Sequence, residues 1–146
     1  MELEHPIKAK VYEALGAIAD QRVELIGNDQ ARITSSAGDR KYTVRWSADR
    51  RRFTSNDNAT RWQGTIGYPI IAVLLVLNEI GSDRRIAAEL AGVPWKQLND
   101  QARRDYGSVI EKVLREKNVD TRVRIEAEVD RIHNELTSFK IERLKP

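Results

Sequence analysis

The 146-residue sequence contains no cysteine and only two histidines, and these shortages exclude several kinds of chemistry. Without cysteine there is no disulfide, no thiol nucleophile and no cysteine-ligated metal site. The sequence also lacks the short motifs of zinc proteases, of α/β-hydrolases and of phosphate-binding glycine loops. We therefore expect no cofactor and no metal, and we predict that the protein is not an enzyme.

Long apolar runs are missing as well. No run approaches the ~20 residues that a membrane span needs, and the N-terminus lacks the basic and apolar regions of a signal peptide. The sequence therefore predicts a cytoplasmic protein without a membrane partner. Hydrophobic residues make up 40% of the chain and charged residues 32%, which is typical of a chain that folds in water. The length predicts a single α+β domain over 1–146.

The longest apolar run, from Ile70 to Leu77, is short but unbroken. Pro69 suits the first turn of a helix and Gly81 suits the residue after the last turn, so the run predicts a helix over 69–80. A helix that is apolar on every side must be surrounded by the rest of the chain. We interpret this helix as the centre of the core. The alternative is that part of its circumference forms an oligomer interface.

Before this run, a helical pattern is followed by alternation. Residues 6–20 predict a helix with one apolar stripe, and its other face suggests no particular chemistry. That polar face carries Lys8, Lys10, Glu13 and Asp20. Residues 22–54 alternate between turn signals and predict an antiparallel β-meander of three or four strands.

Basic residues gather in the predicted meander although the net charge is only +3. This basic patch consists of Arg40, Lys41, Arg45, Arg50, Arg51 and Arg52. Single-strand nucleic-acid platforms combine aromatic rings and cations on one face of a sheet. Strand alternation instead places Tyr42 and Trp46 opposite Lys41 and Arg45. We interpret the patch as solvated surface, and the alternative is non-specific binding of phosphates.

The segment from Arg85 to Asp100 has the spacing of a helix-turn-helix. Small Ala88, Gly92 at the turn, Val93 and Leu98 resemble this motif of DNA-binding regulators. The resemblance implies that 83–104 binds DNA through a recognition helix at 94–102. It would place Lys96, Gln97, Asn99 and Asp100 toward the duplex, and Arg103 and Arg104 near phosphates. Gln101 departs from the motif where an apolar residue is expected, and we favour an ordinary corner between two helices.

Helical patterns continue at 107–117 and 121–140. Apolar residues of the last helix repeat every seven positions, over only two heptads: Ile125, Val129, Ile132, Leu136 and Phe139. We interpret this helix as packed on its own domain, and the alternative is a homodimer through 121–140. One edge of the helix carries Glu126, Asp130 and His133, which we interpret as a solvated edge rather than metal ligands.

Two tryptophans, Trp62 and Trp95, lie beside breaks between helices, and we expect both rings to seal the core. Together these patterns predict an α+β fold with an N-terminal helix, a small meander, a buried central helix and a helical C-terminal half over 69–140. The function that we favour is a non-enzymatic binding or assembly module whose partner is another protein or a second copy. DNA binding through 83–104 is the alternative.

Overall fold

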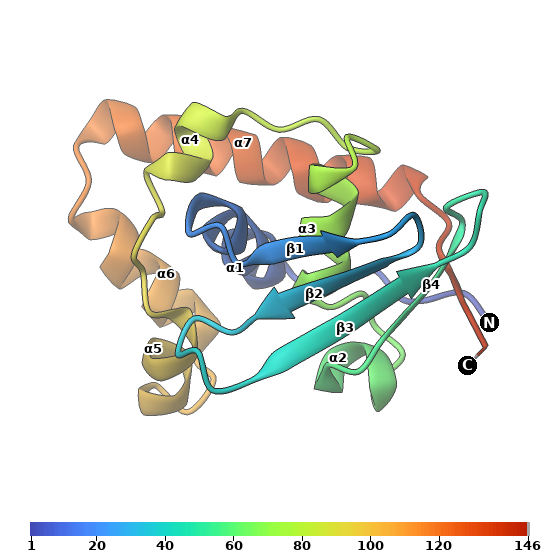
Figure 1. Cartoon of the computed structure of the whole chain (residues 1–146). Helices are drawn as coiled ribbons and strands as arrows, with labels where there is room; N and C mark the ends of the chain where they lie inside the picture. The colour runs from blue at the N-terminus through green and yellow to red at the C-terminus, as the bar shows by residue number, and fades with distance from the viewer. Residues whose placement is uncertain (146) are drawn as a thin grey trace.

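The computed structural model describes residues 1–145 and confirms the predicted α+β class (Figure 1). A β-sheet lies in front of helices in this view, and the C-terminal helices frame the other sides. The elements in chain order are α1 (Lys8–Ala19), β1 (Val23–Ile26), β2 (Gln30–Thr34), β3 (Lys41–Trp46), β4 (Arg52–Ser55), α2 (Asn58–Arg61), α3 (Tyr68–Val76), α4 (Arg84–Ala88), α5 (Trp95–Gln101), α6 (Tyr106–Arg115), α7 (Val119–Ser138) and β5 (Glu142–Arg143).

The sheet contains the predicted meander and one further strand. Strands β1 to β4 pair in chain order and antiparallel, with Ala31 opposite Val44 and Trp46 opposite Phe53. The C-terminal β5 adds parallel to β4 at the edge of the sheet. Two residues are too few for an alternating pattern, so the sequence did not reveal this strand. Helix α2 is a single turn, too short to show a helical pattern, so the sequence did not reveal it either.

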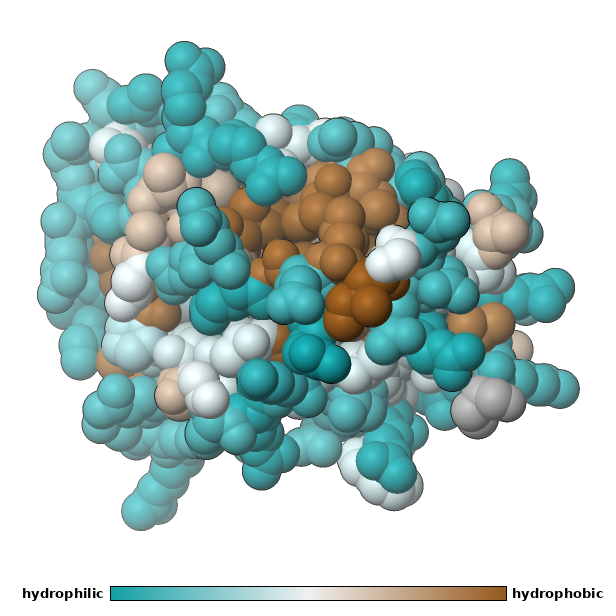
Figure 2. Space-filling model, viewed as in Figure 1, coloured by the Kyte–Doolittle hydropathy of each residue, from teal (hydrophilic) through white to brown (hydrophobic). Residues whose placement is uncertain are grey.

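The two faces of the sheet differ as strand alternation predicts. Val44 and Trp46 are buried on the inner face, whereas Lys41 and Arg45 are exposed on the outer face. Helix α3 lies against the inner face, and α1 packs on α3. The face toward the viewer in Figure 2 is largely hydrophilic over the strands, with apolar surface beside β1 and the C-terminal end of α3.

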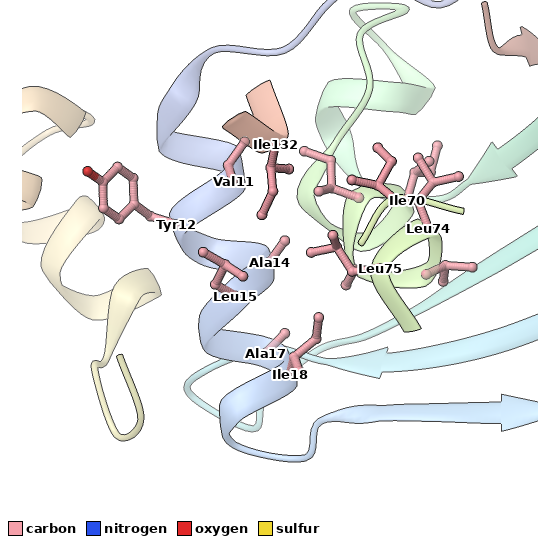
Figure 3. Packing of buried hydrophobic residues seen from close by; sticks show 14 of the residues in the cluster. Val11, Tyr12, Ala14, Leu15, Ala17, Ile18, Ile70, Leu74, Leu75 and Ile132 are labelled. Carbon is pink, nitrogen blue, oxygen red and sulfur yellow. The ribbon is translucent and has the colours of Figure 1, made fainter. Parts of the chain in front are cut away.

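Helix α3 is the buried centre that the apolar run predicts. Every residue from Ile70 to Leu75 is 0% exposed. Figure 3 shows Leu75 between α3 and α1, where Ala14 and Ile18 approach from α1, whereas Leu74 lies on the side of α3 away from α1. Packing on all sides explains why this helix needs no polar face.

The predicted end of the central helix is wrong. Helix α3 ends at Val76, not at residue 80, because Asn78 takes the left-handed conformation at φ 59°. Asparagine tolerates this conformation and ends helices in the same manner as glycine. The helices within the predicted segment 83–104 are short as well: α4 has five residues, and α5, which covers most of the recognition helix implied at 94–102, has seven.

The heptad stripe of helix α7 packs within the chain, as the favoured interpretation expects, and the homodimer stays a prediction. Ile125, Val129, Ile132 and Leu136 are at most 1% exposed within the chain. Helix α7 packs against α1 and α4, so this stripe already has its partners. None of the helices described over 1–145 combines the length and the apolar character that crossing a membrane requires.

Only one of the two tryptophans seals the core. Trp95 is 3% exposed, as expected, whereas Trp62 is 73% exposed and the prediction for it is wrong. The Trp62 ring lies beside the guanidinium of Arg61, at 4.9 Å from the ring centre to the cation. An exposed ring of this kind is covered on one side by its own neighbour rather than by the core.

Candidate functional site

A polar cavity of about 610 Å³ lies where α1, the sheet and α5 meet. Its wall combines segments that are distant in sequence: Lys10 and Glu13 from α1, Tyr42 from β3, Asp57 before α2, Tyr68 from α3, and Asn99 from α5. The lining contains four carboxylates and four lysine or arginine cations, so its formal charges balance. Such a wall offers hydrogen-bond donors and acceptors together.

Glu13 supplies one buried charge of this wall. Its side chain lies on the polar face of α1, yet the residue is only 8% exposed. Oε1 accepts a hydrogen bond from the Asn99 amide at 2.8 Å, and the Lys10 ammonium lies 3.5 Å from Oε2. Burial raises the pKa of the Glu13 carboxyl, while Lys10 and Asn99 oppose that shift. The polar face of the first helix, for which the sequence suggested no particular chemistry, thus supplies two residues of the cavity wall.

Arg22 forms the second cation at depth. Its guanidinium donates to the Thr34 carbonyl at 2.7 Å and lies 3.7 Å from the Asp20 carboxylate. Two of the site's cations are thus engaged by the protein itself, Lys10 by Glu13 and Arg22 by Asp20. Neither is left as a free counter-charge for an anion.

Asp57 is a second buried carboxylate in the lining of the cavity. It begins α2 as the N-cap, because Oδ2 accepts from the Thr60 amide at 3.1 Å. Gly67 makes this position possible, since a β-carbon there would lie 2.1 Å from Oδ2. The residue is 6% exposed.

Two tyrosines and a tryptophan complete the apolar part of the wall. The rings of Tyr42 and Tyr68 meet edge to face, with centres 6.0 Å apart. Burial raises the pKa of both hydroxyls, so both are neutral donors at neutral pH. Trp95 packs flush against α1 because Gly16 has no side chain, and a β-carbon there would lie 2.6 Å from the indole Nε1.

Unpartnered polar atoms concentrate at this cavity. Among the described residues, six buried side-chain nitrogen or oxygen atoms lack a hydrogen-bond partner. Four belong to residues of the lining: Glu13 Oε2, Arg22 Nε, Asp57 Oδ1 and Trp95 Nε1. The first two have an ion-pair neighbour, whereas Asp57 and Trp95 take part in no ion pair among residues 1–145. Buried polar groups are normally satisfied, so this cluster requires an explanation.

Helix α5 is tied to the turn after β2 and closes one side of the cavity. The Lys96 amide donates to the Ser36 hydroxyl at 2.8 Å, and its ammonium donates to Asp39 at 2.9 Å. The hydrogen bond from Lys96 lowers the pKa of Asp39 and raises that of Lys96. This helix is the one that the helix-turn-helix resemblance assigns to DNA recognition.

The residues predicted to touch DNA are divided between the cavity and the solvent. Asn99 is buried against Glu13, and Lys96 is held by Asp39. Gln97, Arg103 and Arg104 are exposed, and both arginines have positive φ. Gly92 takes φ 77°, as the turn of the motif requires. The DNA-binding interpretation stays a prediction.

The basic patch is a solvent-facing surface rather than part of the cavity. Its exposed members are Arg40, Lys41, Arg45, Arg51 and Arg52. Arg50 differs because its guanidinium pairs with Glu79 at 3.1 Å. The edge of α7 has its own partners too: Asp130 pairs with Lys8, Glu126 with Arg122, and His133 Nε2 donates to the Pro6 carbonyl at 2.8 Å. Within residues 1–145 no group of three potential metal ligands is present.

Sequence reasoning singled out six residues of the lining, but for other reasons than this cavity: Tyr42, Trp95, Lys96, Asn99, Asp100 and Arg104. It missed Asp57 and gave Glu13 no role. The only local signal was a helix-capping pattern at Asp57, where a carboxylate precedes Asn58 and Ala59. Nothing local showed that either carboxylate would be buried.

The chain belongs to a protein family whose description reads Uncharacterised conserved protein UCP014422, and the family model matches residues 3–142. The match includes every residue of the cavity wall named above. No curated protein and no solved structure matches the chain.

Proposed function

We propose that this protein binds a small polar molecule in the cavity and does not transform it. One observation carries the proposal: four of the six buried polar atoms without a hydrogen bond in the described residues belong to the cavity lining, and two of these four, Asp57 Oδ1 and Trp95 Nε1, have no ion-pair neighbour either. A buried donor or acceptor without a hydrogen bond lowers the stability of the fold by about 1–3 kcal/mol. A bound molecule with matching groups would restore the missing hydrogen bonds. A volume of about 610 Å³ also lies within the range of small-molecule sites.

The balance of charge supports a small molecule over a polyanion. Four carboxylates face four cations in the lining, and Lys10 and Arg22 already have carboxylate neighbours. A nucleic-acid site would show an excess of free cations instead. The cavity is suited to a ligand with several donors and acceptors.

Nuclear magnetic resonance of the 15N-labelled full chain tests the proposal. The probe is a set of polar metabolite mixtures containing amino acids, amines, polyols and nucleosides. We expect a mixture to shift the indole N–H signal of Trp95, which lies in the cavity wall, while that of exposed Trp62 stays in place. The ligand recovered after long incubation should have an unchanged mass. A changed mass would replace the binding role by an enzymatic one.

Matched variants connect the signal to the cavity. Ala59→Phe adds a ring at a lining position, whereas Ala48→Phe adds the same ring at an exposed turn. We expect the first variant to lose the Trp95 shift and the second to keep it, with circular dichroism confirming that both fold. Equal binding by both folded variants, or no shift with any mixture, would refute the proposal.

Nucleic-acid binding is a second candidate, supported by the exposure of Gln97, Arg103 and Arg104 beside the turn at Gly92. It predicts retention on heparin or duplex DNA that falls steeply with salt. The double variant Arg103→Ala/Arg104→Ala should elute earlier, and absence of retention at low salt would end this interpretation.

We also propose a cytoplasmic location and a homodimer. The cysteine-free chain supports the location. Exposed Val119 and Val123 on α7 support the homodimer.

A further inference from the structure

Most charged side chains of the cavity form ion pairs, but one buried carboxylate does not. Lys10 pairs with Glu13, Arg22 pairs with Asp20, and Lys96 pairs with Asp39 and Asp100. Arg104 and Glu4 are exposed at the rim, where water screens their charge. Asp57 is the one carboxylate of the lining that is buried and makes no ion pair with another residue of 1–145.

A buried carboxylate without a counter-charge is unfavourable. A carboxylate that leaves water loses its hydration, and only an opposite charge or hydrogen bonds compensate for that loss. Asp57 Oδ2 accepts a hydrogen bond from the Thr60 amide, so one of the two carboxylate oxygens has a partner. Oδ1 has no donor from the protein. The missing element is therefore a donor that also carries positive charge.

Aromatic rings line the same cavity as Asp57. Asp57 is close enough to Tyr42 to oppose ionisation of its hydroxyl, and Tyr42 meets Tyr68 edge to face. The negative face of an aromatic ring attracts organic cations at short range. A carboxylate beside two tyrosines offers both the charge and the apolar contact that a protonated amine needs.

We propose that the ligand of this cavity carries a protonated primary or secondary amine, which donates to Asp57 Oδ1 beside the rings of Tyr42 and Tyr68. This inference rests on the proposed binding function and specifies its ligand class. A quaternary ammonium has no N–H to donate, so it fits less well. An anion fits less well still, because the deep cations are already engaged.

Three molecules of nearly equal size separate the charge states: ethanolamine as the cation, ethylene glycol as the neutral compound and glycolate as the anion. Each is titrated into the 15N-labelled full chain at constant ionic strength, and the Trp95 indole signal is followed. We expect saturable shifts with ethanolamine at millimolar concentration, because so few atoms bind weakly. Ethylene glycol and glycolate should give much smaller shifts.

Asp57→Asn and Asp57→Ser test the counter-charge while keeping a residue that caps helices well. We expect both to weaken ethanolamine binding about 10-fold to 100-fold, the range of a charged hydrogen bond. Glu24→Gln removes an exposed carboxylate of β1 that lies outside the cavity lining, and it should leave the affinity unchanged. Thermal unfolding shows which variants fold.

The outcomes distinguish this inference from the broader proposal. Stronger binding of ethylene glycol or glycolate than of ethanolamine would overturn the amine while leaving small-molecule binding intact. Equal loss in Glu24→Gln and Asp57→Asn would overturn the role of Asp57, because the effect would then be general electrostatics. No response of Trp95 to these three compounds or to the metabolite mixtures would overturn both.

Discussion

Glu13 couples the stability of the protein to pH through a single buried carboxyl. Its pKa in the folded chain lies above the ordinary value of 4.5, because burial disfavours the charged form more than Lys10, Asn99 and Arg22 favour it. Below that ordinary value the carboxyl is protonated in both states, and its contribution to stability is fully present. As the pH rises through the folded pKa, the folded chain must release a proton that it holds more tightly than the unfolded chain, and that contribution is lost.

Glu13→Gln should therefore flatten this dependence. The amide keeps the shape of the carboxyl but never ionises. The free energy of unfolding of the variant therefore rises relative to that of the natural protein as the pH rises above 4.5. Urea unfolding at several pH values from 4 to 7 measures the difference in the free energy of unfolding. Glu4→Gln, at an exposed position, should show no such trend. A Glu13→Gln difference that stays constant over this range would contradict the prediction.

Helix α7 joins two surfaces of opposite character on one element. Its inner stripe is buried against α1 and α4, whereas Val119 is 76% exposed and Val123 is 59% exposed on another side. The seven-residue spacing of the inner stripe thus reflects packing within the chain. A dimer through α7 would have to use the outer side, because separating the inner stripe from the core would unfold the chain.

Aspartate substitutions separate the two sides of α7. Ile132→Asp buries a charge at a position that is 0% exposed and should lower the free energy of unfolding by more than about 3 kcal/mol. Val123→Asp should change it by no more than about 0.5 kcal/mol. Urea unfolding measures both, and light scattering reports the mass. A folded Ile132→Asp monomer with normal stability would contradict the packing described here.

At the scale of the whole molecule, the two ends of the chain close the fold together. Figure 1 shows the termini side by side, where β5 adds to the edge of the sheet. The Leu3 amide donates to the Ile141 carbonyl at 2.8 Å, and the Leu144 amide donates to the Phe53 carbonyl at 2.8 Å. Ile141 is only 1% exposed, so the last segment is part of the core.

Removal of 141–146 should lower the free energy of unfolding by at least about 2 kcal/mol, because one buried aliphatic side chain and the edge-strand hydrogen bonds are lost. Removal of 145–146 is the matched control, since Lys145 is exposed. Thermal unfolding followed by circular dichroism compares the two. Equal melting temperatures would show that the closing strand contributes nothing.

The sequence by itself determined the central helix, the faces of the strands and the inward stripe of the last helix. These follow from apolar periodicity, which depends only on neighbours along the chain. Local signals were weaker at boundaries: Asn78 ended α3 before Gly81 could, and β5 was too short to show a pattern.

Only the tertiary structure decided which polar residues are buried. Glu13 and Asn99 are far apart in sequence, and their contact exists because α5 docks on α1. Trp62 and Trp95 have similar local contexts, yet one ring is exposed and the other lies against Gly16. Burial of a polar side chain depends on what packs over it, and that information is spread over the whole chain. The cavity and its unpaired Asp57 could therefore be found only in the folded molecule.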